Sequence, residues 1–180
     1  MIINELVVST SITLKNLGID DAPVIFNAIN QNRHHLRKWL PFVDSTRALK
    51  DTLTFVKSIV DDVERRQEIF TIWFGEEFAG LIGLKDFDYL NRKVEIGYWL
   101  IEEMTGKGII TQAVDKLMEF IFDELELNRI QIKCGVGNHS SSAVPKRLGF
   151  KFEGIERQGE RHFNKYIDLE VYSYLKKDWS

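Results

Sequence analysis

Two glycines flank a lysine at Gly106-Lys107-Gly108, directly before a segment with the apolar spacing of a helix. Glycine allows the backbone to come close to a ligand, because it carries no side chain. The first turn of a helix presents N–H groups without intrahelical partners and a partial positive charge, which together suit an anion. The stretch therefore predicts a phosphate-binding loop, with an ordinary helix entry as the alternative.

Two better-known phosphate-binding motifs do not fit this stretch. A P-loop requires a glycine where the sequence has Ile101, and a serine or threonine where it has Gly108. The dinucleotide fingerprint G-x-G-x-x-G requires a third glycine where the sequence has Thr111. The remaining possibility relies on backbone N–H groups and the helix dipole, with Lys107 as a nearby charge.

Alternating and helical apolar spacings predict a mixed α/β chain around this loop. The expected order is strand, two helices, three strands, helix, strand, helix and two strands. Parallel pairing is expected only where the helix after the glycine loop crosses between strands. The expected strands are Leu6–Lys15, Glu68–Phe74, Phe78–Phe87, Val94–Ile101, Arg129–Val136, Phe150–Gln158 and His162–Leu175. The expected helices begin at Asp20 or Asp21, at Ser45 or Thr46, after Gly108 and near Ser141.

Several residues carry more local expectations. Gly97 predicts a bulge or a close backbone approach within its strand. Pro145 is tolerated in the short helix if Ser142 is the N-cap, because proline then lies in the first turn. In the last strand, the side with Asp168, Glu170 and Tyr172 is expected to face an acceptor or a subunit, and the side with Ile167, Leu169 and Val171 to face the core. The second helix carries an apolar stripe at Leu49, Leu53, Val56, Val60 and Val63.

The composition limits the class of protein. The 180 residues suit one domain, 44% of them are hydrophobic, and the net charge of -3 provides no global basic surface for nucleic acid. No apolar run reaches the length of a membrane span, and the N-terminus lacks the pattern of a signal peptide. The single cysteine, Cys134, favours a reducing, cytoplasmic location and is expected to be a buried structural thiol.

Four stretches then match one known family in order. Glu103–Gly108 matches the loop Q/R-x-x-G-x-G/A except at Glu103, and Asn138, Ser141 and Leu148-Gly149-Phe150 match N-x-x-S followed by L-G-F. With EIGYWL at Glu95–Leu100 and LRKWLPF at Leu36–Phe42, the sequence resembles the GNAT N-acetyltransferases, and most of all the RimJ/RimL branch that acetylates protein N-termini.

The resemblance implies a fold and a co-substrate. It implies an α/β GNAT fold over residues 1–180 as one domain, with about four helices and a mixed central sheet of about seven strands that splays between the fourth and fifth. Acetyl-CoA would be the co-substrate. Its pantetheine arm would meet backbone groups of Trp99, Leu100 and Ile101, and its pyrophosphate would meet Gly106, Lys107, Gly108, Ile109 and Ile110.

The resemblance also implies direct attack of an amine on the thioester. Ser141 would protonate the departing thiolate, or it would only cap a helix. Asn138 would bind the pantetheine amide or shape the turn. Either Glu95 or Glu103 would take the proton from nitrogen, directly or through water.

The acceptor amine is the least constrained part. An α-amine has a pKa near 7.8 and lysine one near 10.4, so a modest base suffices for an α-amine at neutral pH. No strong base is evident, which favours an N-terminal α-amine, or another weakly basic amine, over lysine. The acceptor cleft would be lined by Arg33, His34, His35, Arg37 and Trp39, or these residues would form only a basic helix end with a core tryptophan.

The remaining expectations concern partners. No metal site is expected, because the adjacent His34 and His35 cannot easily converge on one ion. No direct nucleic-acid or membrane contact is expected, and the family branch implies a homodimer or higher homo-oligomer. Two alternatives stay open: acetylation of a small amine such as a polyamine or an aminoglycoside-like compound, and a non-catalytic domain that binds CoA.

Overall fold

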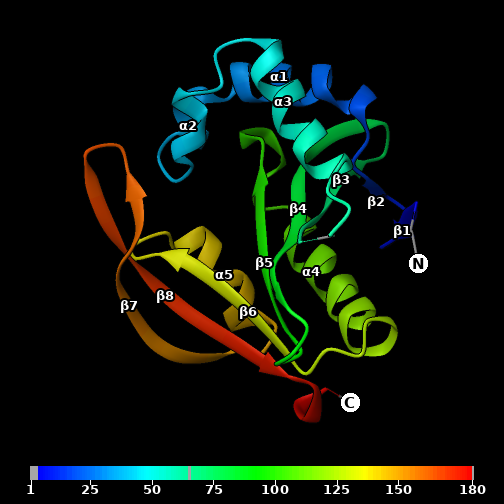
Figure 1. The fold of residues 1–180 in the computed structure, drawn as a ribbon, viewed down its shortest axis with the longest axis vertical. Coiled ribbons are helices and arrows are strands. Elements are labelled where there is room, and N and C mark those ends of the chain that lie inside the picture. The colour runs from blue at the N-terminus through cyan, green and yellow to red at the C-terminus, as the bar shows by residue number, and fades with distance from the viewer. Residues whose placement is uncertain (1–3, 65, 180) are drawn as a thin grey trace. The chain divides into compact units, whose positions relative to one another are not determined.

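The computed structural model describes residues 4–64 and 66–179. Within them, eight strands form one mixed sheet in the order β1-β2-β3-β4-β5-β6-β8-β7 (Figure 1). The strands are β1 (Glu5–Val7), β2 (Ile12–Asn16), β3 (Glu68–Phe74), β4 (Glu77–Asp88), β5 (Lys93–Leu100), β6 (Arg129–Gly135), β7 (Lys151–His162) and β8 (Lys165–Leu175). The α-helices are α1 (Ala22–Gln31), α2 (Arg33–Leu36), α3 (Leu49–Val60), α4 (Ile109–Glu119) and α5 (His139–Arg147). None of the described helices is long and apolar enough to cross a membrane.

The strand count exceeds the prediction because the expected strand Leu6–Lys15 folds as a hairpin. The Ser9 hydroxyl oxygen accepts hydrogen bonds from the backbone N–H groups of Ser11, at 3.4 Å, and Ile12, at 3.2 Å. A serine side chain that bonds the backbone two and three residues on stabilises a turn. The class of fold, a mixed α/β sheet with flanking helices, is confirmed.

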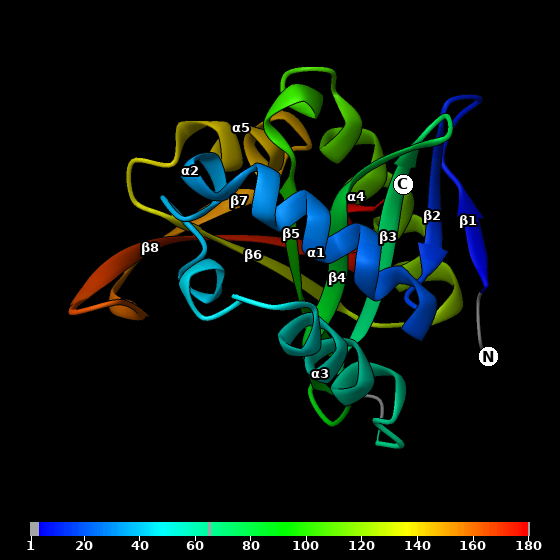
Figure 2. The ribbon, with the colours of Figure 1, turned by 90° about the horizontal axis from the view of Figure 1, so that it is seen from above.

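The chain divides into two compact units. The first takes the chain up to Gly83 together with Tyr98–Ile109, and the second takes Leu84–Gly97 together with the chain from Ile110. In the first unit, α1 and α3 pack against each other (Figure 2). Its buried core includes Ile25, Val56 and Phe78.

The expected helix start at Ser45 or Thr46 is wrong, since α3 begins at Leu49 after the N-cap Ala48. The Asp51 carboxylate accepts hydrogen bonds from the backbone N–H groups of Arg47 and Ala48, and these bonds lower the pKa of Asp51. The apolar stripe is correct at Val56, which is fully buried, but Val63 lies beyond the helix and is 94% exposed.

In the second unit, the parallel ladder between β5 and β6 is short. It runs from Lys93↔Arg129 to Glu95↔Gln131, although β6 continues to Gly135. The crossover between the two strands contains α4 and the π-helical turn Phe120–Glu124, as expected for a parallel pair. Glu95 therefore lies at the last registered pair of the ladder.

The β7–β8 hairpin continues the sheet of the second unit beyond β6. Its bulge at Glu153 lies against Arg129 at the start of β6, whose Nη1 donates to Glu153 Oε1 at 2.7 Å. Ser173 Oγ donates to the same oxygen at 2.7 Å. The Arg129 guanidinium, helped by Ser173, lowers the pKa of Glu153 to about 2.

Glu153→Gln is therefore expected to destabilise the protein at neutral pH but not in strong acid. A depressed carboxyl pKa contributes stability above the unfolded value of 4.5, and that contribution is lost as pH falls towards about 2. The carboxylate is partly exposed, so we expect the melting temperature to fall by only a few degrees at pH 7. Thermal melts of both proteins at pH 7, 4 and 2.5 measure this: the difference should shrink as the pH falls, and a difference as large at pH 2.5 as at pH 7 would contradict it.

Candidate functional site

The candidate residues belong to both compact units, and each unit is described in turn. In the first unit, Gly106 and Gly108 both have a φ of +74°, a left-handed conformation that favours glycine. The loop around them is exposed, whereas Met104 before it and Ile109 after it are buried. Ile110, the next residue of α4, is also buried. The loop is thus anchored at both ends, and α4 begins at Ile109 directly after it.

Lys107 does not extend freely from this loop. Its Nζ lies 3.6 Å from Met104 Sδ and 5.5 Å from the centre of the Phe74 ring. An ammonium over an aromatic face is held by the negative potential of the ring. Glu103, the residue that departs from the family pattern, is exposed in the 3-10 turn Glu102–Met104.

The end of β5 is tied to β4 in the same unit. The N–H of Ile101 donates to the carbonyl oxygen of Ala79 at 2.9 Å, and its own carbonyl accepts from Met104 N at 3.1 Å. Both main-chain groups of Ile101 therefore bond within the chain, and its carbonyl oxygen can accept one more hydrogen bond. A Cβ on Gly80 would lie 2.0 Å from the Trp99 carbonyl oxygen, so the close backbone approach occurs at Gly80. Gly97, where it was expected, has only an ordinary contact with Lys85.

The α2 segment of the first unit contains the predicted acceptor residues. His34 and Arg37 are exposed, Trp39 is half-buried, and Arg37 Nη2 pairs with Asp44 Oδ2 at 2.9 Å. Lys38 Nζ lies 5.5 Å from the centre of the Trp39 ring. The segment, expected to be a loop, contains α2 and the 3-10 turn Pro41–Asp44.

Two side chains brace this segment: Arg33, which was expected to line the acceptor cleft, and Asn32, which the sequence analysis did not single out. Arg33 Nη1 donates to the Val43 carbonyl oxygen at 2.7 Å, and its Nη2 donates to the Thr46 carbonyl oxygen. Asn32 Oδ1 accepts from the backbone N–H of Glu102 at 3.0 Å, which joins the segment to the turn before the glycine loop. Adjacent polar residues give no sequence signal for such roles, because both depend on tertiary contacts.

Arg33→Ala is expected to lower the free energy of unfolding by about 1.5–3 kcal/mol, because it removes charged donors from two backbone carbonyls. Arg33→Lys should recover only part of this, since an ammonium lacks the planar fork that reaches both oxygens. Urea unfolding measures the change, with Lys57→Ala on α3 as a matched loss of an exposed cation. A loss from Arg33→Ala no larger than that of Lys57→Ala would contradict the bracing role.

In the second unit, Glu95 is a buried carboxylate, only 7% exposed. Lys85 Nζ lies 2.9 Å from its Oε1, and Lys133 Nζ lies 3.8 Å from its Oε2. Gln131 Nε2 donates to Oε2 at 3.4 Å. A buried charge requires such partners, so Glu95 is held in place where the β5–β6 ladder ends.

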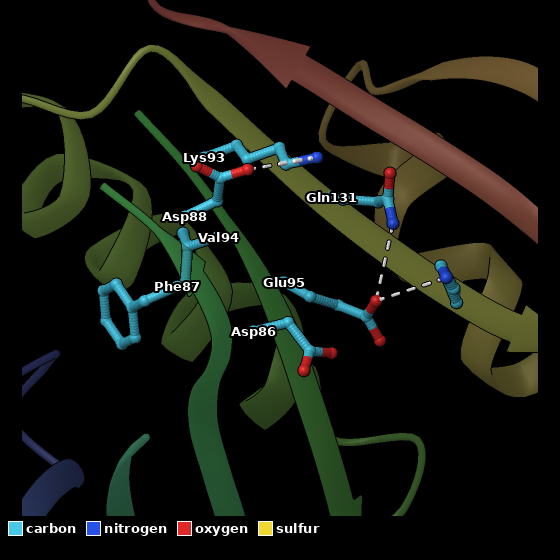
Figure 3. A pocket seen from close by; sticks show the side chains of 8 residues that line it. Asp86, Phe87, Asp88, Lys93, Val94, Glu95 and Gln131 are labelled. Atoms are coloured by element: carbon cyan, nitrogen blue, oxygen red, sulfur yellow. Dashed lines mark hydrogen bonds and ion pairs between the residues drawn. The ribbon is translucent and has the colours of Figure 1, made fainter. Parts of the chain in front are cut away.

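A hollow opens beside Glu95, as Figure 3 shows. Asp86 and Asp88 on β4 and Lys133 on β6 contribute charges to its lining, and Lys93 lies 3.6 Å from Asp88. Lys133 also pairs with Glu156 Oε2 on β7 at 2.7 Å. Despite desolvation of the ammonium, the Glu156 bond and the Glu95 charge raise the pKa of Lys133. The Glu95 carboxylate therefore lines this hollow, and the ammonium groups of Lys85 and Lys133 balance its charge.

On α5 in the same unit, Asn138 is the N-cap, and its side-chain oxygen accepts from Ser141 N at 3.3 Å. Asn138 thus shapes the turn, and Ser141 lies in the first helical turn instead of at the cap. The Ser141 hydroxyl lies 3.3 Å from Cys134 Sγ, and the thiol is 2% exposed. Cys134 is buried, as predicted.

Pro145 lies inside α5, not in its first turn, because the N-cap is Asn138 and not Ser142. Proline has no N–H to donate to the carbonyl of Ser141 four residues earlier. The helix continues for only two residues after Pro145, and Gly149 then ends it with a φ of +80°. The short length of α5 limits what proline disrupts.

On the predicted polar side of β8, Asp168 is exposed, but Glu170 and Tyr172 do not form a free polar face. Tyr172 is 1% exposed, and its hydroxyl donates to Glu170 Oε2 at 2.5 Å. Burial, together with the Glu170 carboxylate, raises the pKa of Tyr172. Lys146 on α5 lies 3.9 Å from Glu170 Oε2, so this side packs beneath α5.

Comparison with known proteins agrees with this architecture. Residues 11–151 match the model of the acetyltransferase (GNAT) domain. The chain is 39% identical over 177 residues to YdaF of Bacillus subtilis strain 168, whose name provisionally gives it as a ribosomal N-acetyltransferase; the match covers 96% of this chain and 95% of that protein. It is 32% identical to the ribosomal-protein-serine acetyltransferase of Escherichia coli K12, over 93% of this chain and 94% of that protein.

A solved structure is similar over almost its whole length. RimL, described as a ribosomal L7/L12 alpha-N-protein acetyltransferase in complex with coenzyme A, superposes with a TM-score of 0.91 at 26% identity, covering 97% of this chain and 99% of that chain. The family match spans well over half of the chain. The chain belongs to the GNAT family and is an N-acetyltransferase of the RimJ/RimL type.

Proposed function

We propose that the chain transfers the acetyl group of acetyl-CoA to the N-terminal α-amine of a protein, of the ribosomal-protein type. The observation that carries this acceptor class is the near end-to-end similarity to the E. coli ribosomal-protein-serine acetyltransferase, at 32% identity. In this proposal residues 1–180 act as one catalytic domain, in the cytoplasm, as a homodimer or higher homo-oligomer, and without a metal.

Acetyl-CoA binding is assigned to the glycine loop and its surroundings. The left-handed glycines at 106 and 108 and the N–H groups of the first turn of α4 suit a pyrophosphate. Backbone groups of Trp99 and Leu100 would serve the pantetheine arm, with Asn138 as a further contact. Ile101 contributes by holding the end of β5 against β4.

The chemistry is direct attack of a neutral amine on the thioester carbon. Glu95 takes the proton from the attacking nitrogen, directly or through a water molecule, and Ser141 donates a proton to the departing sulfur. Glu95 lines the hollow in the second unit, whereas Glu103 is exposed in its turn, and this position supports Glu95 over Glu103 as the base. An α-amine, with a pKa near 7.8, is partly neutral at physiological pH and needs only modest assistance.

The acceptor chain is assigned to the α2 segment, where His34, Arg37 and Trp39 are accessible in whole or part. Arg33 and Asn32 support this assignment, because they fix the segment and tie it to the turn before the glycine loop. A segment held in one conformation loses less entropy on binding a peptide.

Thiol release from acetyl-CoA tests the proposal with a panel of short peptides, the same peptides with a blocked α-amine, free lysine and spermidine. We expect turnover with the free peptides and loss of turnover when the α-amine is blocked. Turnover with spermidine but not with any peptide would replace the protein acceptor with a small amine.

A further inference from the structure

A guanidinium reaches the first turn of α4 from the end of α5. Arg147, the last residue of α5, donates from Nη1 to Thr111 Oγ1 at 2.8 Å. Thr111 is the third residue of α4 and follows Gly108 by three positions. The helix that begins at the glycine loop therefore has an arginine bound to its first turn.

The charge of Arg147 is not neutralised locally. It is exposed, and no carboxylate pairs with it anywhere in residues 4–64 and 66–179. The adjacent Lys146 differs, since its Nζ lies 3.9 Å from Glu170 Oε2 and 5.7 Å from the centre of the Tyr172 ring. A neutral hydroxyl thus positions the guanidinium without cancelling its charge.

The lysine of the glycine loop is less available than its sequence position suggests. Lys107 Nζ lies against Met104 Sδ and over the Phe74 ring. Moving it onto a phosphate would break both contacts, whereas Arg147 has several N–H groups beyond the one that Thr111 uses. Guanidinium groups also match phosphate oxygens in a bidentate manner that an ammonium cannot.

We propose that Arg147 is a phosphate-binding residue of the acetyl-CoA site, positioned by Thr111, and that it contacts an ADP phosphate of coenzyme A. This inference rests on the proposed function. Coenzyme A offers two such groups, the pyrophosphate and the 3′-phosphate of its ribose, and both share the chemistry that a guanidinium recognises.

Calorimetric titration of the full chain with CoA and with 3′-dephospho-CoA tests the inference. Arg147→Gln is expected to bind CoA about tenfold or more weakly than wild type. Arg147→Lys should bind CoA with intermediate affinity. Thr111→Val keeps the charge of Arg147 but removes the hydroxyl that positions it, so it should lose less affinity than Arg147→Gln. Arg157→Gln, a matched loss of an exposed arginine on β7, should bind like wild type.

The two ligands distinguish the two phosphates. If Arg147→Gln and wild type bind 3′-dephospho-CoA equally, the contact is with the 3′-phosphate; if the variant is weaker towards both ligands, the contact is with the pyrophosphate. If Arg147→Gln bound CoA as tightly as Arg157→Gln does, this inference would be overturned while the proposed function would stand. Wild-type protein that binds neither ligand would overturn the proposed function and this inference with it.

Discussion

Glu95→Gln is expected to lower kcat by about 100-fold, while KM for acetyl-CoA stays within about twofold. The amide keeps the size of the side chain but cannot take a proton from the attacking amine. Deprotonation of the acceptor would then depend on the solvent and on its own pKa, near 7.8 for an α-amine. The deficit should therefore be largest at low pH and shrink as pH rises, which initial rates from pH 6 to 9 measure.

Glu103→Gln is the matched control, because Glu103 is the competing base and is exposed in its turn. We expect it to keep most of the activity. The amide at position 95 also removes the charge partner of Lys85, so melting temperatures and CoA affinity of both variants must accompany the rates. If Glu95→Gln retained wild-type turnover across the pH range, or if Glu103→Gln lost more activity, Glu95 would not be the base.

Local patterns in the sequence predicted most of the elements. The expected strand Glu68–Phe74 is β3 residue for residue, and the helix after the glycine loop ends at Glu124 with its π-helical turn. These segments combine strong apolar periodicity with clear turn residues at their ends. Where a side chain decided the local structure, as Ser9 and Asp51 do, the predicted boundaries were wrong.

The surroundings of Glu95 required information that periodicity does not provide. The sequence identified Glu95 as a candidate base, but it did not show which side chains surround it. The two ammonium groups come from β4 and β6, and their approach depends on strand register. The alternating apolar residues of β6 predict on which side of the strand Lys133 lies. They do not predict that Glu95 is its partner.

Glycines and apolar alternation indicated which features the sheet has, but not at which residue or on which side each feature lies. The sheet has a close backbone approach, yet it is at Gly80 in β4 instead of Gly97 in β5. Alternation correctly placed Glu170 and Tyr172 on one side of β8, but that side is covered by α5. Which side a helix covers follows from the crossover connections, and those are not encoded in the strand itself.

Ser141→Ala is expected to lower kcat by about 100-fold without weakening acetyl-CoA binding, because the departing thiolate loses its proton donor. Ser140→Ala is the matched control: Ser140 is the preceding residue, is exposed and lies in the same helical turn. The side-chain cap of α5 comes from Asn138, so neither substitution removes it. A loss of activity in Ser141→Ala is therefore not explained by a lost helix cap.

The neighbouring thiol provides a second comparison. Ser141 Oγ lies 3.3 Å from Cys134 Sγ, so a role of the serine must be separated from a role of the cysteine. Direct transfer requires no covalent intermediate on Cys134, and Cys134→Ala should keep kcat within about tenfold of wild type, with the loss arising from packing. Equal kcat for wild type, Ser140→Ala and Ser141→Ala would remove Ser141 from the chemistry. If Cys134→Ala lost as much kcat as Ser141→Ala while still binding CoA, direct proton donation by the serine alone would no longer account for the reaction, because the pair would be acting together.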